Sequence, residues 1–338
     1  MSTPFRLEAT RGGIAESVHR VSLAVVDGAG CLVAASGDPG LVAFWRSAAK
    51  PFQAMPLVAE GAADAVGFSA AELALACASH SSEPVHLATV DAMLRKVGLG
   101  EEALACGPHT PLGPAVAARV AREGTALTPR WSNCSGKHTG MLAAARHAGM
   151  PAAGYERAGH PLQQRILAEV SRWTGTPAGQ MVLGVDGCTV VSFGLPLQAM
   201  ALAYARFGTS TEPAAARLRS AMLAHPEMIA GEGRLCTDLM RAGQGRVVAK
   251  LGADGIYCAA LPAAGLGLAL KVEDGDMASL GPALVGVLDR LAARFPLGVE
   301  PAALGPAVRR HAEAPILNTR GVPTGSLRAV GELRFPGS

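Results

Sequence analysis

A serine and a lysine three residues apart could form a nucleophile and its base. Ser47 and Lys50 lie within Trp-Arg-Ser-Ala-Ala-Lys-Pro-Phe at positions 45–52. On a helix they would share a face, within hydrogen-bonding reach. A serine hydroxyl is a weak nucleophile until a base takes its proton, and a desolvated neutral lysine can be that base. This spacing arises by chance about once in a few hundred residues, so other parts of the chain must support it.

Lysine is rare in this chain, which makes each lysine informative. Arginine cannot lose its proton in a protein, whereas a buried lysine can. Each lysine therefore marks a candidate position for a neutral amine. The alternative is that a GC-rich coding bias converted most lysines to arginine and left a few at random. Of 30 basic residues only five are lysines, namely Lys50, Lys96, Lys137, Lys250 and Lys271.

Two further motifs could supply the rest of an acyl-transfer site. Such a site needs a second proton carrier and donors for an oxyanion. Lys250 begins Lys-Leu-Gly-Ala-Asp-Gly on an expected strand. The other motif places four polar side chains at the end of an expected helix: Ser79, His80, Ser81 and Glu83. This motif has an alternative explanation, because Ser81 or Ser82 could cap the helix that begins at Pro84.

A second cluster of residues has the composition of a metal site. Two thiols, an imidazole and a carboxylate occur on turns beside helix or strand ends, which is typical of a zinc site assembled from two segments. Lys137 could bring its amine to the metal if that amine is deprotonated. Buried structural thiols explain the cysteines equally well. The residues concerned are Asn133, Cys134, Lys137 and His138 in one segment and Asp186 and Cys188 in the other.

Composition excludes several classes of protein. The chain has 338 residues, of which 49% are apolar and 17% charged, and this favours a globular protein. A net charge of +3 and 4% aromatic residues give no indication of nucleic-acid binding. We expect no membrane segment and no export signal, hence a cytoplasmic protein. Seven cysteines, an odd number, favour free thiols or metal ligands over a disulfide framework.

The order of expected elements predicts an α/β (α+β) fold. Strand patterns lie at both ends of the chain, with a hairpin over 18–37, three strands between 246 and 273, and a last strand over 326–335. Helical patterns dominate the middle, at 48–66, 69–78, 84–97, 114–122, about 135–149, 161–173, 197–207 and 212–224. We therefore expect residues 1–338 to form a single catalytic unit. Its antiparallel sheet lobe would come from the N- and C-terminal segments, about 1–45 and 245–338, and its mostly helical central lobe from about 46–244.

The motifs taken together resemble one enzyme family. Six of them recur in order over about residues 15–275, and this register is far more specific than a single serine-lysine spacing. The chain is similar to the Rhizobium-type L-asparaginases, which share a fold with class A β-lactamases and glutaminases. The motifs are Ser47-Ala-Ala-Lys50-Pro-Phe-Gln, Ser79-His-Ser-Ser-Glu-Pro-Val-His, Cys106-Gly-Pro-His, Asn133-Cys-Ser-Gly-Lys-His-Thr-Gly, Gly184-Val-Asp-Gly-Cys and Lys250-Leu-Gly-Ala-Asp-Gly.

The resemblance implies a role for each matching residue. Ser47 would be the nucleophile with Lys50 as its base, and Ser79 with Lys250 would form a second pair. Lys271 remains an alternative to Lys250, because strand register decides which lysine faces Ser79. Zinc would be held by Cys134, Lys137 and Cys188. Substrate contacts are expected from Arg46, His80, Ser81, Glu83, Asn133, His138 and Asp186. Ser82 departs from the pattern, because glycine is expected at that position.

The implied activity is hydrolysis of L-asparagine to L-aspartate and ammonia by a cytoplasmic homodimer. Acylation of Ser47 would release ammonia, and water would then cleave the ester. Two alternatives stay open. A glutaminase or β-lactamase-like serine hydrolase would share the same motifs. A non-catalytic relative that binds a metal or a ligand would have no need to keep Lys50 and Lys250 as lysines.

Overall fold

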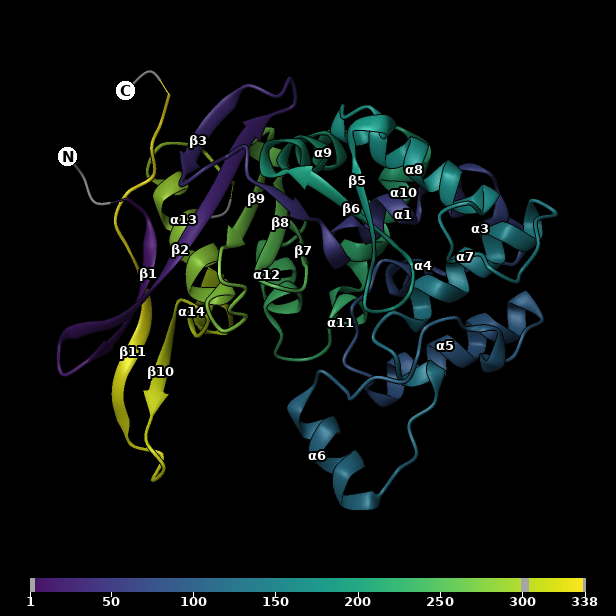
Figure 1. The fold of residues 1–338 in the computed structure, drawn as a ribbon, viewed down its shortest axis with the longest axis horizontal. Coiled ribbons are helices and arrows are strands. Elements are labelled where there is room, and N and C mark those ends of the chain that lie inside the picture. Colours follow the sequence, from purple (N-terminus) through teal and green to yellow (C-terminus); the bar gives the residue numbers. More distant parts are fainter. Residues whose placement is uncertain (1–3, 299–303, 337–338) are drawn as a thin grey trace. The chain divides into compact units, whose positions relative to one another are not determined.

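The computed structural model describes residues 4–298 and 304–336. The chain divides into two compact units, each of which combines segments that are far apart in the sequence (Figure 1). The first unit consists of Met1–Ala48, Leu195–Thr209 and Asp238–Ser338. The second consists of Ala49–Gly194 and Ser210–Thr237. Among the described residues, none of the helices is both long and apolar enough to cross a membrane.

An antiparallel sheet forms the centre of the first unit. Its strands follow the order β10-β11-β1-β2-β9-β8-β7, and β3 pairs with the C-terminal half of β2. The sheet thus comes from the two ends of the chain, which confirms a mixed α/β architecture with an antiparallel sheet. The strands are β1 (Arg6–Arg11), β2 (Ile14–Asp27), β3 (Leu32–Ser36), β7 (Val248–Leu251), β8 (Ile256–Leu261), β9 (Leu266–Val272), β10 (Glu313–Leu317) and β11 (Pro323–Val330).

The predicted hairpin near the N-terminus is confirmed, and its turn chemistry explains it. The Asp27 carboxylate accepts the backbone N–H groups of Ala29 and Cys31, both at 2.9 Å. Gly30 has a φ of 93°, which a glycine adopts without steric cost. Buried apolar residues fill β2 from Val21 to Val26. The turn and this apolar run together fix the pairing of β2 with β3.

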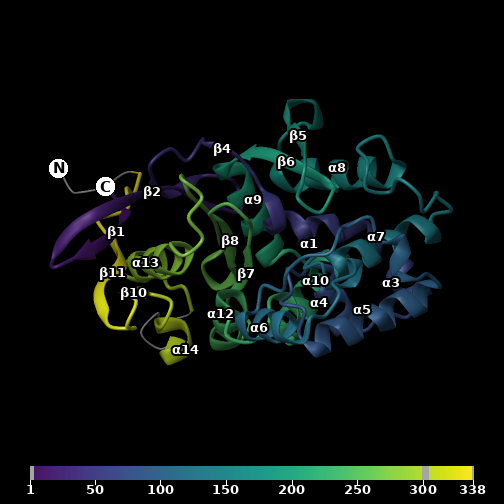
Figure 2. The ribbon, with the colours of Figure 1, turned by 60° about the horizontal axis from the view of Figure 1, so that its bottom comes forward.

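Helices α9 (Leu197–Thr209) and α13 (Leu280–Ala292) pack on the sheet of this unit (Figure 2). α9 lies against β2, β8 and β9, and α13 contacts β1 and β8 to β11. Gly267 permits the close approach of α9, because a Cβ atom there would lie 2.1 Å from the Ala201 carbonyl oxygen. The remaining elements of this part are β4 (Val42–Phe44), α14 (Gly305–Arg309) and α12 (Leu235–Gly243), of which α12 begins in the second unit.

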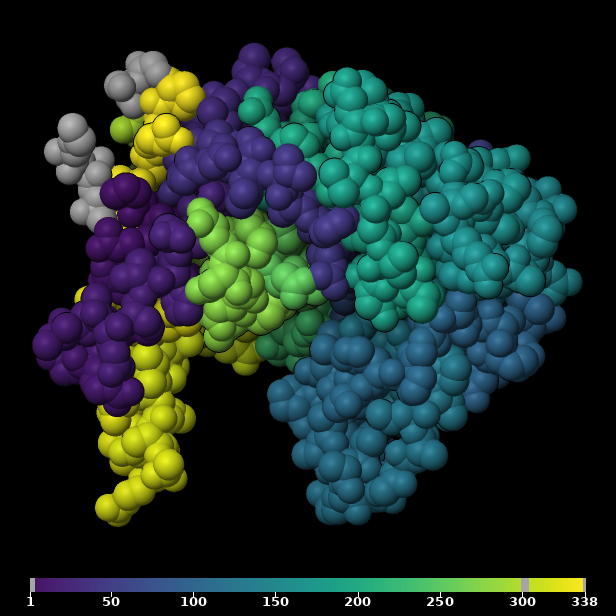
Figure 3. Space-filling model, in the orientation of Figure 1, coloured from purple at the N-terminus to yellow at the C-terminus, as the bar shows by residue number. Residues whose placement is uncertain are grey.

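Two hairpin tips of the first unit carry exposed apolar side chains. Ile14 is exposed at the turn between β1 and β2. Leu317 and Val322 are exposed at the end of the β10–β11 hairpin, which extends from the body of this unit in the space-filling view (Figure 3). In the sheet order, Leu317 lies on β10, the strand farthest from the Lys250 strand β7, whereas Ile14 begins β2 near the middle of the sheet.

The second unit is mainly helical and is organised around α7. Residues Ser135 to Ala145 of this helix are buried on every side. Gly140 lets a neighbouring helix approach closely, because a Cβ atom there would lie 3.2 Å from the Ala76 side chain. The helices are α1 (Lys50–Gln53), α2 (Met55–Ala59), α3 (Ala62–Ala65), α4 (Ala70–Ala76), α5 (Pro84–Val97), α6 (Pro114–Glu123), α7 (Ser135–His147), α8 (Pro161–Thr174), α10 (Pro213–Ala224) and α11 (Pro226–Ile229).

Local sequence signals explain most of these helix boundaries. α4 begins with a complete capping box formed by Ser69 and Glu72. α5 begins at Pro84 and ends at Gly98, which has a φ of 70°. α6, α8 and α10 also begin with proline in the first turn. The predicted positions of these helices are confirmed to within a few residues.

A hairpin positions Cys188 in the second unit. It joins β5 (Val182–Val185) to β6 (Val191–Pro196). The Asp186 backbone N–H donates to the Val190 carbonyl at 2.8 Å, which closes the turn. Thr189 has a φ of 75°, a left-handed conformation that is uncommon for threonine. The turn thereby directs Cys188 into the interior, where its side chain is buried.

The structure corrects one expected helix and adds strands that the sequence did not reveal. The segment 48–66 is not one helix. It consists of the 3₁₀ turn η1 (Arg46–Ala49) followed by α1, α2 and α3. Pro56 removes a backbone donor, and Gly61 is left-handed with a φ of 81°, so a continuous helix cannot form. Pro51 lies in the first turn of α1, as predicted. The strands β1, β4, β6 and β10 were not predicted.

Helix α9 lies with the sheet and not with the other central helices. Its residues fall inside the sequence range 46–244 that was expected to form the helical lobe. Its apolar face packs on β2, β8 and β9, so it belongs to the first unit. A helix pattern in the sequence carries no information about which surface the helix will cover.

Candidate active site

Ser47 lies on η1, two residues after the buried Trp45. The Trp45 side chain is fully buried, and its indole N–H donates to Cys258 Sγ at 3.3 Å. Burial raises the pKa of the Cys258 thiol to about 12, so this sulfur stays protonated. The Trp45 ring also meets Tyr204 edge to face at 6.3 Å. Arg46 and Ser47 are half-buried, and the residue that precedes them, Trp45, is thus fixed by packing.

Tyr204 fixes the residue after Ser47. Its hydroxyl, at the buried end of the side chain on α9, donates to the Ala48 carbonyl at 2.8 Å. Sequence reasoning missed this residue, because a tyrosine inside an alanine-rich helix is typical of a core position. No local signal links positions that are 156 residues apart.

Arg46 lies beside a cleft of about 470 Å³ in the first unit. Its φ is 53°, in the left-handed region, and its guanidinium forms an ion pair with Asp254. Phe44 and Lys271 also line the cleft. Strained backbone of this kind is often found at functional sites. The arrangement gives the expected substrate contact Arg46 access to a cavity.

The two candidate lysines of the first unit differ sharply in burial and in their partners. Lys250 on β7 has no exposed surface, and its amine donates to the Leu251 carbonyl at 2.9 Å. Lys271 on β9 is partly exposed, and its amine donates to the carbonyls of Asp254 and Val272, both at 2.6 Å. β8 lies between β7 and β9, so the two lysines lie two strands apart in the sheet and not on neighbouring strands.

In the second unit, Lys50 and Ser79 are in direct contact. The Lys50 side chain is 1% exposed, and its amine donates to Ser79 Oγ at 3.0 Å. The same amine donates to the Ala78 carbonyl. A buried amine touching a serine hydroxyl is an arrangement that can move a proton between the two groups.

The turn that follows Ser79 is held by buried side chains. The Ser82 backbone N–H donates to His80 Nδ1 at 3.2 Å, so the ring proton lies on Nε2, which donates to Ser135 Oγ at 3.0 Å. Burial places the pKa of His80 well below its usual value, so the ring stays neutral. Both ring nitrogens of His80 therefore form hydrogen bonds within the protein. The expected contact of His80 with the substrate stays a prediction.

The capping explanation for Ser81 and Ser82 is wrong. The N-cap of α5 is Glu83. Ser81 Oγ donates to the Ala230 carbonyl at 2.7 Å, and Ser82 Oγ donates to the Trp131 carbonyl at 2.8 Å. Ser82 also has a φ of 56°, which explains why glycine suits this position. These serines connect the turn to other segments of the unit instead of starting a helix.

A thiol and an amine meet in the second cluster. Lys137 Nζ lies 3.0 Å from Cys188 Sγ, and Asn133 Oδ1 lies 2.9 Å from Cys134 Sγ. The hydrogen bond from Cys188 lowers the pKa of the Cys134 thiol despite burial, and the same bond together with burial raises the pKa of Cys188. Burial disfavours the charge on Lys137, but both cysteines outweigh it and raise the pKa of the amine. The cluster thus brings together the three expected zinc donors.

His138 leaves one ring nitrogen without a partner in this cluster. Its Nδ1 lies 2.6 Å from the Tyr155 hydroxyl. Its Nε2 is buried without a hydrogen bond, and the side chain neighbours Cys188. Burial lowers the pKa of His138 to about 4, so the ring is neutral at pH 7. A buried polar atom without a partner indicates a ligand or an ion at this position.

The other expected contacts flank these clusters. The Asn133 carbonyl accepts the His80 N–H at 3.2 Å, and Asp186 lies half-buried in the β5–β6 turn. Glu83 accepts the Glu232 N–H at 2.9 Å. Within residues 4–298 and 304–336, no group of three or more His, Cys, Asp or Glu side chains is placed to hold a metal. A metal here would therefore depend on Lys137 as a ligand.

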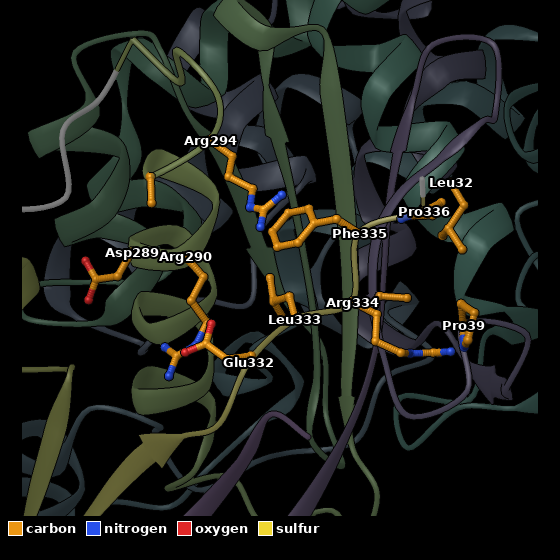
Figure 4. Close-up of a pocket in the computed structure, with 12 residues that line it drawn as sticks. Leu32, Pro39, Asp289, Arg290, Arg294, Glu332, Leu333, Arg334, Phe335 and Pro336 are labelled. Carbon is orange, nitrogen blue, oxygen red and sulfur yellow. The ribbon is translucent and has the colours of Figure 1, made fainter. Parts of the chain in front are cut away.

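A separate cleft of about 1090 Å³ lies in the first unit (Figure 4). Arg290 of α13 and Arg294, just after the end of that helix, line one part of it, and the segment 332–336 lines another. The Arg294 guanidinium stacks 4.2 Å from the centre of the Phe335 ring. The residues that line this cleft include none of the predicted site residues. The candidate chemistry does not use it.

Comparison with known proteins gives one match. Residues 7–329 match the family model described as L-asparaginase II. No curated protein matches the chain. The match spans all six motifs and both structural units.

Proposed function

The chain belongs to the L-asparaginase II family, and on that premise we propose that it hydrolyses L-asparagine to L-aspartate and ammonia through an acyl-enzyme on Ser47. The observation that carries the proposal is the buried amine of Lys50 at 3.0 Å from Ser79 Oγ. Two motifs that are 29 residues apart in the sequence meet there, and both polar side chains are buried. Burying an amine is costly unless its hydrogen bonds are satisfied, and the Lys50 amine donates to Ser79 Oγ and to the Ala78 carbonyl.

In the first half of the reaction, Ser47 attacks the side-chain amide carbon of asparagine. Lys50 in its neutral form accepts the proton of the Ser47 hydroxyl, and the amide nitrogen receives a proton as the C–N bond breaks. Ammonia leaves, and an aspartyl ester remains on Ser47. Water then attacks the ester carbon, a base takes the proton of the water, and the Ser47 hydroxyl is restored.

Ser79 and Lys250 form the second proposed pair. The hydrogen bond from Lys50 to Ser79 supports a role for Ser79 in carrying protons to and from the base. Lys250 is favoured over Lys271, because Lys250 is fully buried and Lys271 is bound to carbonyls at the Asp254 turn. A fully buried lysine on a strand carries a larger desolvation penalty than a packing role would justify.

The proposed fold is that of serine β-lactamases and glutaminases. Support comes from the antiparallel sheet made from the two ends of the chain. The mostly helical second unit between those ends gives further support.

Substrate recognition is proposed for seven polar residues. Arg46 suits the substrate carboxylate, because arginine binds carboxylates with two parallel hydrogen bonds. Arg46 would have to exchange its present partner Asp254 for the substrate. The other proposed contacts are His80, Ser81, Glu83, Asn133, His138 and Asp186.

Zinc is the proposed metal, held by Cys134, Lys137 and Cys188. The donor set fits, since two thiols and an amine converge beside the unpartnered His138 Nε2. When bound, zinc would supply a fixed positive charge for the substrate's polar end. Lys137 would have to lose its proton to become a ligand, and the cysteines would bind as thiolates.

A cytoplasmic homodimer is the proposed working form. All seven cysteines are free thiols in this structure, which is typical of a reducing compartment. The dimer is proposed from the family resemblance and is tested by measuring the mass of the protein in solution.

The proposal is tested by comparing substrates under one set of conditions. Ammonia release is measured with L-asparagine and with L-glutamine, and hydrolysis of nitrocefin is measured in parallel. We expect asparagine to give the highest kcat/KM. Faster turnover of glutamine or nitrocefin would reassign the enzyme to a sibling activity, and no turnover of all three would indicate a binding protein. Metal analysis of protein purified without chelator tests the zinc separately.

A further inference from the structure

Both backbone groups of Ser79 are held by the segment 229–234. The Ser79 N–H donates to the Ile229 carbonyl at 2.9 Å. The Ser79 carbonyl accepts a hydrogen bond from Arg234 Nη1 at 2.7 Å. All of these residues belong to the second unit. Sequence analysis gave no role to this segment.

The same segment follows the turn after Ser79 for several residues. Ser81 Oγ donates to the Ala230 carbonyl, and the Glu232 N–H donates to the Glu83 carboxylate. Gly231 has a φ of 120°, and a Cβ atom there would lie 2.5 Å from Glu83 Oε1. The close approach therefore requires glycine at 231.

These bonds fix the direction of the Ser79 side chain. The peptide plane before Ser79 is held through its N–H and through the Ala78 carbonyl, which accepts from Lys50. The plane after Ser79 is held through its own carbonyl by Arg234. When both planes are fixed, the Cα–Cβ bond has one direction. The χ1 rotamer then sets the position of Ser79 Oγ, which lies 3.0 Å from Lys50 Nζ in the structure.

We propose that Arg234 is a positioning residue for Ser79, an inference that rests on the proposed role of Ser79 in proton transfer. Arg234 holds the Ser79 carbonyl and thereby the distance between Ser79 Oγ and Lys50 Nζ. It acts through Ser79 and touches neither reacting atom in this account. A misplacement of about 1 Å at a reacting group can lower a rate by about 10²-fold.

Arginine suits this task better than other donors. The same Nη1 also lies 3.2 Å from the Ala230 carbonyl and 3.5 Å from Ser81 Oγ. A single charged nitrogen thus contacts both backbone segments that meet here, through the carbonyls of Ser79 and Ala230. The guanidinium keeps its charge at every working pH, and charge-assisted hydrogen bonds are stronger than neutral ones.

The test uses Arg234→Ala and Arg234→Lys in the full chain. We expect Arg234→Ala to lower kcat for asparagine by about 10²-fold with KM within about threefold of the wild type. Arg234→Lys keeps the charge and should retain activity within about tenfold. Low millimolar guanidinium chloride should restore part of the kcat of Arg234→Ala. The matched control is Arg217→Ala, since Arg217 on α10 pairs with Asp64 at the surface and should show neither loss nor rescue.

A second readout needs no activity. Hydrogen exchange at the backbone N–H groups of Ser79 and His80, which donate to Ile229 and Asn133, should accelerate in Arg234→Ala and less in Arg234→Lys. Wild-type kcat in Arg234→Ala, or unchanged exchange at Ser79, would overturn the proposal. A rise in KM with unchanged kcat would also overturn it, because Arg234 would then bind the substrate directly.

The two proposals fail in distinguishable ways. If the wild-type protein releases no ammonia from asparagine, the proposed function fails. The hydrogen-exchange comparison of wild type, Arg234→Lys and Arg217→Ala still decides whether Arg234 holds Ser79. If Arg234→Ala does not fold, Arg234→Met carries both readouts, because methionine keeps most of the side-chain length and has no hydrogen-bond donor. Normal kcat with normal exchange in that variant contradicts a geometric role.

Discussion

The two serines of the proposed mechanism are held by different kinds of interaction. In the first unit, Ser47 lies between a buried tryptophan and an alanine whose carbonyl is bonded by a buried tyrosine. In the second unit, Ser79 lies in a turn held by hydrogen bonds from Arg234 and by the neutral ring of His80. The surroundings of Ser47 are thus held mainly by the packing of aromatic side chains, and those of Ser79 mainly by hydrogen bonds.

This difference predicts two kinds of sensitivity. A support made of aromatic packing fails when volume is removed and is insensitive to pH. A support made of buried hydrogen bonds fails when one partner is removed, because the other partner is left unsatisfied. It also weakens when a buried neutral group gains a proton. Variants in each support should therefore show different profiles.

The largest effect on stability is expected from Trp45→Ala. The side chain is fully buried and contacts Tyr204 and Cys258. Removing a buried aromatic residue typically costs about 3–5 kcal/mol in the free energy of unfolding. Asparagine turnover should fall as well, because Ser47 follows two residues later. Urea unfolding measures the change, Trp45→Phe is the milder control, and a loss below about 1 kcal/mol contradicts the packing account.

The support in the second unit should depend on pH. Burial holds the pKa of His80 below its unfolded value of 6.5. Below pH 6.5 the unfolded chain therefore binds a proton that the folded chain excludes, so the free energy of unfolding falls as pH is lowered. His80→Gln should cost about 1–3 kcal/mol at pH 7 and should weaken this dependence. Unfolding measured from pH 7.5 to 5 in both proteins checks this, and an unchanged dependence in the variant would refute it.

A smaller effect separates backbone strain from hydrogen bonding at Ser82. Ser82→Ala keeps a left-handed residue and loses the bond to the Trp131 carbonyl, at a cost of about 1–2 kcal/mol. Ser82→Gly loses the same bond but relieves about 1 kcal/mol of strain. Glycine should therefore be the more stable of the two, close to the wild type. If alanine is as stable as glycine, strain at this turn is negligible.

The sequence predicted residue types better than it predicted their supports. Ser47 and Lys50 were found because a hydroxyl three residues from an amine has a chemical meaning that spacing can reveal. Ser79 was expected from a group of polar side chains, and its role in a pair came from the family resemblance. Glycine was expected at position 82 from the family resemblance, and the left-handed φ of Ser82 gives that expectation a physical reason. Helices that begin with proline, such as α5, were placed well because their signals are local.

Other features could not be read from the sequence. Tyr204 and Arg234 act on backbone carbonyls that are more than 150 residues away, and a carbonyl leaves no signature in the sequence. The segment 48–66 was misread because its apolar pattern outweighed the effect of Pro56. The expected zinc ligands were proposed from their residue types, but the contact between Lys137 and Cys188 is visible only in the structure.

The most direct test of the account is the turnover of Ser47→Ala. With the fold verified by circular dichroism, ammonia release from L-asparagine should fall by on the order of 10⁴-fold or more. Lys50→Arg should be nearly as damaging, because an obligate cation cannot accept the serine proton. Ammonia release by Ser47→Ala within tenfold of the wild type would contradict the assignment of Ser47 as the nucleophile.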